Sequence, residues 1–188
     1  MTTRNSVVEE LKSDHREVEE LIARYDKAPS GSEERKHIAD LFTIELVRHS
    51  VAEEMYLYPA VRRCVVGGEA LADKELEDHA GVEKRLKGLE RARTPCGGVR
   101  RPGRCFAGGS QRACARRGEQ SPPRLQRACT VQELIELGDK VRAAKQTAPT
   151  RPHPHAPDSP ATLKLLAPGA GLVDRVRDYV TGRGRTTS

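Results

Sequence analysis

The residues best suited to chemistry lie between His49 and Pro59, in the segment His-Ser-Val-Ala-Glu-Glu-Met-Tyr-Leu-Tyr-Pro. His49 and Glu53 are four residues apart, so on a helix their side chains leave the same face. Apolar residues around them recur at helical spacing, and this stripe passes through both positions. The residues that define the stripe are Ile38, Phe42, Leu46, Tyr56 and Ala60. A buried carboxylate needs a partner, and a metal ion is one such partner. By itself the pair leaves a simple buried His–Glu hydrogen bond as an open alternative.

Two further amphipathic segments each carry one histidine at the same kind of position. The first opens with a capping box at Ser6–Glu9, and His15 interrupts its apolar stripe. The other carries His79 between apolar residues at helical spacing. We therefore predict helices over 6–27, 34–64 and 70–89, the second of them bent or loosened by Pro59.

Three histidines on three facing helices favour a metal site, because the cores of helical bundles are where helices build such sites. The predicted ligands are His15, His49, Glu53 and His79, which we expect to converge. The remaining histidines do not fit the pattern. His37 is predicted at the surface, and His153 and His155 are predicted to be solvated residues of the tail.

The chain of 188 residues is long enough for one domain with an appendage. It has two Phe, four Tyr and no Trp, so the core must be mainly aliphatic. No segment reads as a membrane span or a signal peptide, so we expect a cytoplasmic protein without membrane contact. The five cysteines show neither the spacing of a zinc ribbon nor an even count, and indicate no disulfide framework.

One segment differs in composition from the rest of the chain. Residues 91–129 contain ten Arg, one Glu and no Lys or Asp. Within it, residues 91–122 are rich in Gly and Pro and lack apolar periodicity, so we expect irregular structure where a fourth core helix should lie. Helical signals return at about Pro123, and a second capping box starts at Thr130.

The C-terminal part is predicted to be a tail. Residues 147–168 are rich in proline and predicted to be extended, similar to polyproline. A short amphipathic helix over 171–180 is predicted to pack its apolar side on the bundle. The resulting division is a helical bundle over 1–147, with 91–122 aberrant, and a Pro-rich tail over 148–188.

These motifs resemble the hemerythrin-like HHE cation-binding family. The resemblance rests on His15, on His49-x3-Glu53 followed by an aromatic residue and proline, and on Glu77-Asp78-His79. The tail segments 148–154 and 168–174 look like extensions of bacterial members. The match covers 6–90 and about 123–182. It implies an all-α, up-and-down four-helix bundle around a non-haem di-iron centre, with His15, His49, Glu53 and His79 in the family's ligand positions and Glu53 bridging or capping the metals.

The chain departs from this family on the fourth helix, where a second His-x3-Glu is expected. The segment 59–63 (Pro-Ala-Val-Arg-Arg) is echoed by 123–127 (Pro-Arg-Leu-Gln-Arg), and the same offset places Ala113 and Arg117 where the ligands should be. The end of the fourth helix is thus present and its ligand half replaced. A compensating pair of frameshifts, near residue 91 and near Pro122, would explain both the composition and the preserved length.

Three functions are compatible with the sequence. The first is a non-enzymatic, iron-binding protein that binds or senses O2, NO or an oxidant, with a depleted site that holds at most about one metal. The second is nucleic-acid binding through the Arg-rich segment 91–129, which we disfavour because only Phe106 could stack on a base there. The third is a damaged bundle without metal function, in which the core around Leu11, Val18, Leu46 and Leu86 is exposed.

Overall fold

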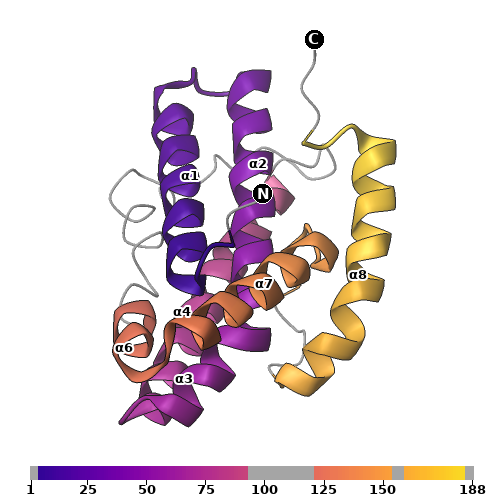
Figure 1. Ribbon diagram of the computed structural model, residues 1–188. Helices are drawn as coiled ribbons and strands as arrows, with labels where there is room; N and C mark the ends of the chain where they lie inside the picture. Colours follow the sequence, from indigo (N-terminus) through magenta and orange to yellow (C-terminus); the bar gives the residue numbers. More distant parts are fainter. Residues whose placement is uncertain (1–3, 93–120, 154–158, 185–188) are drawn as a thin grey trace.

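The computed structural model describes residues 4–92, 121–153 and 159–184, and the regular structure in these ranges is helical. The elements are α1 (Val7–Lys27), α2 (Glu33–Ala52), the π-helical turn η1 (Glu53–Leu57), α3 (Tyr58–Cys64), α4 (Gly68–Ala92), α6 (Ser121–Ala128), α7 (Val131–Thr147) and α8 (Pro160–Thr181) (Figure 1). The predicted all-α class is confirmed, and so are the three predicted N-terminal helices and the helix after Thr130. Most of the aberrant segment 91–122 lies outside the described residues, so its irregularity stays a prediction.

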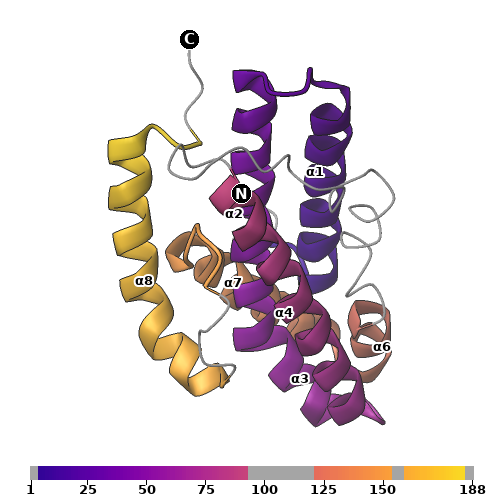
Figure 2. The same cartoon turned by 180° about the vertical axis from the view of Figure 1, so that it is seen from behind.

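The elements form a helical bundle with α6 and α8 at its margins (Figure 1). α1 and α2 run side by side in opposite directions, and α4 packs against α2 on the side that faces the viewer in Figure 2. α7 crosses α1 and α2 on the other side, and α6 packs against α1 and α3 (Figure 1). At Gly138 α7 approaches the start of α1 so closely that an added Cβ would lie 2.5 Å from the Asn5 carbonyl oxygen.

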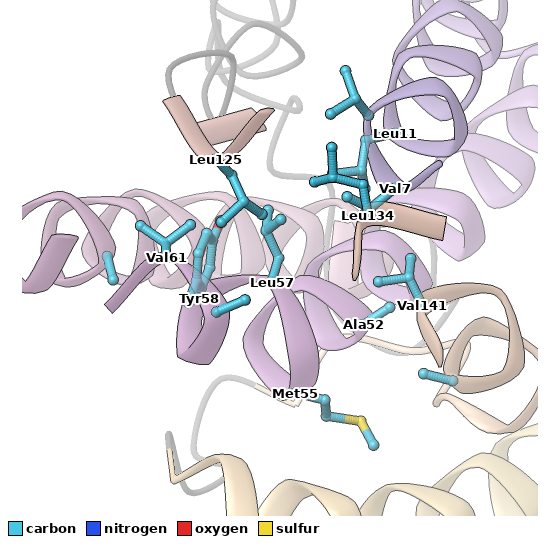
Figure 3. Packing of buried hydrophobic residues seen from close by; sticks show 14 of the residues in the cluster. Val7, Leu11, Ala52, Met55, Leu57, Tyr58, Val61, Leu125, Leu134 and Val141 are labelled. Atoms are coloured by element: carbon cyan, nitrogen blue, oxygen red, sulfur yellow. The ribbon is translucent and has the colours of Figure 1, made fainter. Parts of the chain in front are cut away.

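The main core joins α1, η1 and α3 to the two helices that follow the undescribed segment (Figure 3). Leu125 of α6 is fully buried there, and so is Val141 of α7. The echo of the fourth-helix end therefore corresponds to a packed helix. The expected exposure of the core is wrong for Leu11, Val18 and Leu86, each at most 2% exposed. Leu11, for example, packs in one cluster with residues of α7.

The second predicted helix changes its hydrogen bonding just before Pro59. From Glu53 to Leu57 the chain forms a π-helical turn, in which the Tyr58 N–H donates to the Glu53 carbonyl five residues earlier. This wider turn is the loosening expected from proline, whose nitrogen has no hydrogen to donate. It places Glu53 and Tyr58 on the same side of the helix, which matters for the site below.

The prediction for the tail is wrong in two respects. Residues 160–168 are not extended but belong to α8, which begins at Pro160 and continues through Pro168. Proline is favourable in the first turn of a helix, where no N–H is required, and Pro168 costs the helix one hydrogen bond. Packing of Ala167 and Gly171 on the protein offsets that cost.

The second error concerns the face on which α8 docks. Most of its large apolar residues face outward, and its buried side includes Asp174 and Asp178 beside Leu163 and Ala167. Asp174 accepts hydrogen bonds from the backbone N–H groups of Thr150 and Arg151 and pairs with the His153 ring at 3.0 Å. His153 is thus half-buried and paired rather than solvated, whereas His155 lies outside the described residues. Also contrary to expectation, His37 is half-buried.

The described helices include no segment with the length and apolar character that a membrane span requires.

Candidate metal centre

The first site residue comes from α1, whose buried face follows a heptad-like spacing through Leu11, Asp14 and Val18. Asp14, and not His15, occupies the central position of this stripe and is 8% exposed. His15, one residue further round the helix, is half-buried beside it. Because the buried stripe centres on Asp14, α1 contributes two groups to the interior, the Asp14 carboxylate and the neighbouring His15 imidazole.

His15 and His49 meet between α1 and α2 with their Nε2 atoms 3.2 Å apart. Glu53, one turn further along, places its Oε1 3.4 Å from His49 Nε2. Ligand atoms of these three residues all lie within 4.8 Å of one another. Two ligands of one ion, each about 2.0–2.2 Å from it, are themselves about 3–3.5 Å apart. The separations of 3.2 Å and 3.4 Å from His49 Nε2 match this value, and the third is at most 4.8 Å, so a small approach of His15 and Glu53 would let two imidazoles and one carboxylate oxygen hold a single cation.

His79 reaches the other oxygen of the same carboxylate. Its Nε2 lies 3.2 Å from Glu53 Oε2. The Tyr58 hydroxyl donates to Oε2 at 3.0 Å and lies 3.0 Å from His79 Nε2. The three predicted histidine ligands thus lie around the carboxylate of the fourth, Glu53, with His15 and His49 toward Oε1 and His79 and Tyr58 toward Oε2.

The outer ring nitrogens of two histidines are held by carboxylates. His49 Nδ1 lies 3.1 Å from Asp14 Oδ2, and His79 Nδ1 lies 3.0 Å from Glu54 Oε1. Asp14 in turn pairs with Lys145 of α7. A carboxylate on the second nitrogen is the usual support of a metal-binding histidine, because it fixes both the tautomer and the ring orientation.

Without an ion, protons balance the charge of this buried cluster. Burial opposes the charged form of His49, but Glu53 and Asp14 outweigh it and raise its pKa to about 9. Burial acts in the same way on His79, whose contacts with Glu53 and Glu54 raise its pKa to about 10. Burial and the neighbouring His49 charge lower the pKa of His15. For Glu53, burial is outweighed by His49 and His79, so its pKa falls well below the usual value and the carboxylate stays ionised.

One atom of this cluster has no hydrogen bond. Glu53 is completely buried, yet its Oε1 accepts no hydrogen bond from the described residues. His49 Nε2 lies 3.4 Å from it, which is an ion-pair contact rather than a hydrogen bond. Leaving an ionised oxygen without a hydrogen bond in a protein interior is costly. The atom faces the two imidazole nitrogens, so a cation at this point would satisfy all three.

A cavity of about 470 Å³ borders the centre on the side of α8. Apolar residues of α2, α4 and α8 form most of its wall, and Glu54 and His79 reach it from the centre. The outer edge of the site is therefore in contact with a space that can admit small molecules.

Reasoning from sequence missed Asp14 and Tyr58, and assigned no role to Glu54. The spacing 7, 11, 14, 18, 21, 25 could have identified Asp14, since it fits the buried stripe better than His15 does. Tyr58 is brought to Glu53 by the π-helical turn, which regular helical spacing does not predict.

Comparison with known proteins agrees with this geometry. The sequence profile of the hemerythrin HHE cation binding domain matches residues 6–116. The chain belongs to the hemerythrin HHE cation-binding family. It is also similar to an uncharacterized hemerythrin-like protein of Schizosaccharomyces pombe, with 24% identity over 140 residues that cover 74% of this chain and 69% of the relative. No solved structure matches the chain.

All described ligand candidates fall within the matched range, as does Ala113, whereas Arg117 lies one residue beyond its end. Ala113 and Arg117 lie outside the described residues, so the replacement of those ligands is known from the sequence alone. α7 and α8 lie beyond the matched range. The contacts of Lys145 with Asp14, and the α8 wall of the cavity, are therefore made by residues outside the matched range.

Proposed function

We propose that this hemerythrin-family protein is a non-enzymatic iron-binding protein whose ion is held by His15, His49 and Glu53, with His79 on the second oxygen of Glu53. The observation that carries the proposal is the buried Oε1 of Glu53, which lacks a hydrogen bond and faces two imidazole nitrogens. Nitrogen and carboxylate donors together suit iron, and also zinc or manganese.

Each residue has a distinct part in this proposal. His15 and His49 supply neutral nitrogens, Glu53 supplies negative charge, and Asp14 and Glu54 orient two of the rings. Iron, when bound, would supply reversible binding of O2, NO or an oxidant at positions that the protein does not fill. The cavity beside Glu54 and His79 provides access for such a molecule. A binding or sensing role requires no catalytic residue.

The test is the metal content of the full chain, measured by inductively coupled plasma mass spectrometry after purification without chelators. Glu53→Gln removes the charge with little change of shape and should lower the iron content at least about tenfold. The matched control is Glu77→Gln on the exposed side of α4, which should bind as the wild type does. Circular dichroism should show the same helicity for both variants. Equal metal content in wild type and Glu53→Gln would refute the proposal.

A further inference from the structure

The helix α8 is amphipathic in the reverse of the usual sense. Its buried face has one large apolar residue, Leu163, beside Ala167 and Gly171, and it carries two aspartates. At Gly171 an added Cβ would lie 2.2 Å from the Thr147 carbonyl oxygen, so the helix backbone rests directly on the preceding segment. Asp178 then pairs with Arg151 and Arg183. α8 is thus attached through close backbone contact and ion pairs, and its large apolar side chains are left for another surface.

The outward face of α8 is apolar along most of its length. Six aliphatic side chains on it are between 50% and 79% exposed: Leu165, Leu166, Leu172, Val173, Val176 and Val180. With 100° per residue, they and Gly169 fall on one side of the helix, opposite the two buried aspartates. Together they expose on the order of 700 Å². Stable interfaces of standard size need about 600–1,000 Å² per partner.

The order of these residues is self-complementary about the point between Leu172 and Val173. In two antiparallel copies of α8, residues near the middle of the face meet when their numbers add to the same value. Centred there, Leu165 meets Val180 and Gly169 meets Val176, while Leu172 and Val173 lie on either side of the two-fold axis, where each meets its own copy. Every apolar position meets an apolar or glycine position, and no two charges of the same sign are opposed. A two-fold interface has this property, because residue i meets j while j meets i.

We propose that this protein forms a two-fold symmetric dimer in which the outward faces of two α8 helices pack antiparallel about Leu172 and Val173. Gly169 lets the backbones approach, because nothing lies within 4 Å of the point where its Cβ would be. The contact extends over residues 165–180, about 23 Å of helix at 1.5 Å per residue.

Among the described residues, the charges that flank this face favour a second copy over a lipid surface. A helix that lies on a membrane carries several basic residues beside its apolar face. Here the ammonium of Lys164 lies over the Tyr56 ring, and Arg175 donates to the carbonyls of Gln146 and Ala148. Only Arg177 remains as an exposed basic side chain near the middle of the helix. Binding to a lipid surface would also not require the self-complementary order of the apolar residues.

The experiment is sedimentation equilibrium of the full chain with two double variants. Leu172→Glu with Val173→Glu places four negative charges at the two-fold axis, so the apparent mass should fall from twice 20.7 kDa to 20.7 kDa. Leu165→Lys with Val180→Glu places each Lys near a Glu of the other copy only if the helices are antiparallel in this register, so this variant should remain dimeric. The control, Val66→Glu with Val131→Glu, changes exposed apolar residues outside α8 and should not alter the mass.

Circular dichroism establishes that each variant is folded, which is expected because all the changed side chains are exposed. A wild type that is monomeric at every concentration would overturn the proposal, as would a dimer that survives Leu172→Glu with Val173→Glu. So would a monomer that cosediments with phosphatidylcholine–phosphatidylserine vesicles. A dimer that is lost in the Lys–Glu variant would exclude the antiparallel register.

Discussion

At the scale of single residues, Glu53 connects the two halves of the candidate centre. Its two oxygens face different groups, and each imidazole in hydrogen-bonding or ion-pair contact with it, His49 and His79, has a second carboxylate behind it. Lys145 neutralises Asp14 as well, so the charges balance while both imidazoles are protonated, and a bound cation would take the place of those protons at Glu53. The role of Asp14 can be tested separately from those of the candidate ligands, because Asp14 contacts Nδ1 of His49 whereas Glu53 contacts Nε2.

Asp14→Ala should weaken metal binding by about 10–100-fold without removing a ligand. His49 would keep its place on α2 but lose the acceptor at Nδ1, so its ring would no longer be held toward Glu53. Affinity is measured by competition with a chromophoric chelator. Asp26→Ala, a change at the exposed end of α1, is the matched control and should leave affinity unchanged. If Asp14→Ala binds metal as tightly as the control does, Asp14 has no positioning role.

The sequence was sufficient to predict that His15, His49, Glu53 and His79 lie close together, and insufficient to predict how they are grouped. His49 and Glu53 share a helix, so their separation follows from helical geometry alone. His15 and His79 are on other helices, and the side of Glu53 that each one contacts depends on how those helices are rotated. On α1 the stripe centres on Asp14, which is adjacent to the position inferred from the apolar residues. An error of one residue corresponds to 100° of rotation, which periodicity of a short segment does not resolve.

At the scale of elements, α8 shows where sequence patterns fail. Three prolines between 154 and 160 and one at 168 indicate extended chain, and the apolar side of 171–180 indicates a buried face. Both inferences assume that local preference decides. Instead Asp174 and Asp178 gain buried partners in segment 150–153, so tertiary contacts select a helix with its apolar side outward. The sequence alone does not show that Asp174 and Asp178 lie on the side of α8 that packs against the protein.

The close approach at Gly171 gives a prediction for α8. Gly171→Ala should lower the free energy of unfolding by about 2 kcal/mol or more, because the added methyl group would overlap backbone atoms of residues 147 and 148. Gly88→Ala is the matched change in α4. Nothing lies within 4 Å of its added Cβ, so it should stabilise the protein by about 0.5–1 kcal/mol. Urea unfolding followed by circular dichroism compares the two. Equal effects would show that α8 does not rest on residues 147–148.

The contact of His153 with Asp174 should make the attachment of α8 depend on pH. Its hydrogen bond to Asp174 raises the pKa of His153 above 6.5, while burial and Lys87 oppose the shift and Glu83 adds to it. The folded protein thus binds this proton more tightly than the unfolded chain does. The stabilisation is complete below about pH 6.5 and is lost as the pH rises through the folded pKa. The side chain is 42% exposed, so solvent screening limits the effect to under about 1 kcal/mol.

Comparison of wild type with His153→Gln tests this linkage. The difference in free energy of unfolding should be largest near pH 5.5–6 and should shrink toward alkaline pH. The pKa of Asp174 sets the lower end of the pH range in which this contact stabilises the protein. Burial raises that pKa, but the hydrogen bonds with His153 and with the backbone N–H groups of residues 150 and 151 outweigh burial, so the pKa is lowered. An NMR titration of the His153 ring protons gives the pKa directly. A value at or below 6.5 would contradict the prediction.

At the scale of the whole molecule, the described helices bury a large main core and two smaller clusters although the ligand half of the fourth helix is replaced. α6 and α7 contribute Leu125, Leu134 and Val141 to that core. Loss of the ligand half of the fourth helix therefore does not imply a collapsed bundle. The hypothesis of a damaged bundle rested on an exposed core, and Leu11, Val18 and Leu86 are buried. Nucleic-acid binding by the Arg-rich segment depends on residues that are mostly outside the described ranges, and it stays untested.

The number of ions per chain follows from how the donors are distributed. Toward Oε1 of Glu53 the described residues offer two imidazoles and an oxygen that has no hydrogen bond. Toward Oε2 they offer only His79 beside the Tyr58 hydroxyl, and both already contact that oxygen. A second ion would need the His and Glu of the fourth helix, where the sequence has Ala113 and Arg117. Alanine cannot coordinate, and the cation of an inward-pointing arginine would repel a metal strongly in a medium of low dielectric constant.

We therefore predict at most about one iron per chain, measured by plasma mass spectrometry against protein concentration from amino-acid analysis. Ala113→His with Arg117→Glu alone should not add a second ion, because the Gly and Pro residues around them disfavour a helix. Translation of the coding DNA for codons 88–125 in all three forward frames should reveal an amphipathic helix with His-x3-Glu near 113 and 117. A chain carrying that translated segment in place of residues 91–122 should bind two ions. Two tightly bound irons in the present sequence would refute this account, because they would require ligands that neither the described residues nor positions 113 and 117 supply.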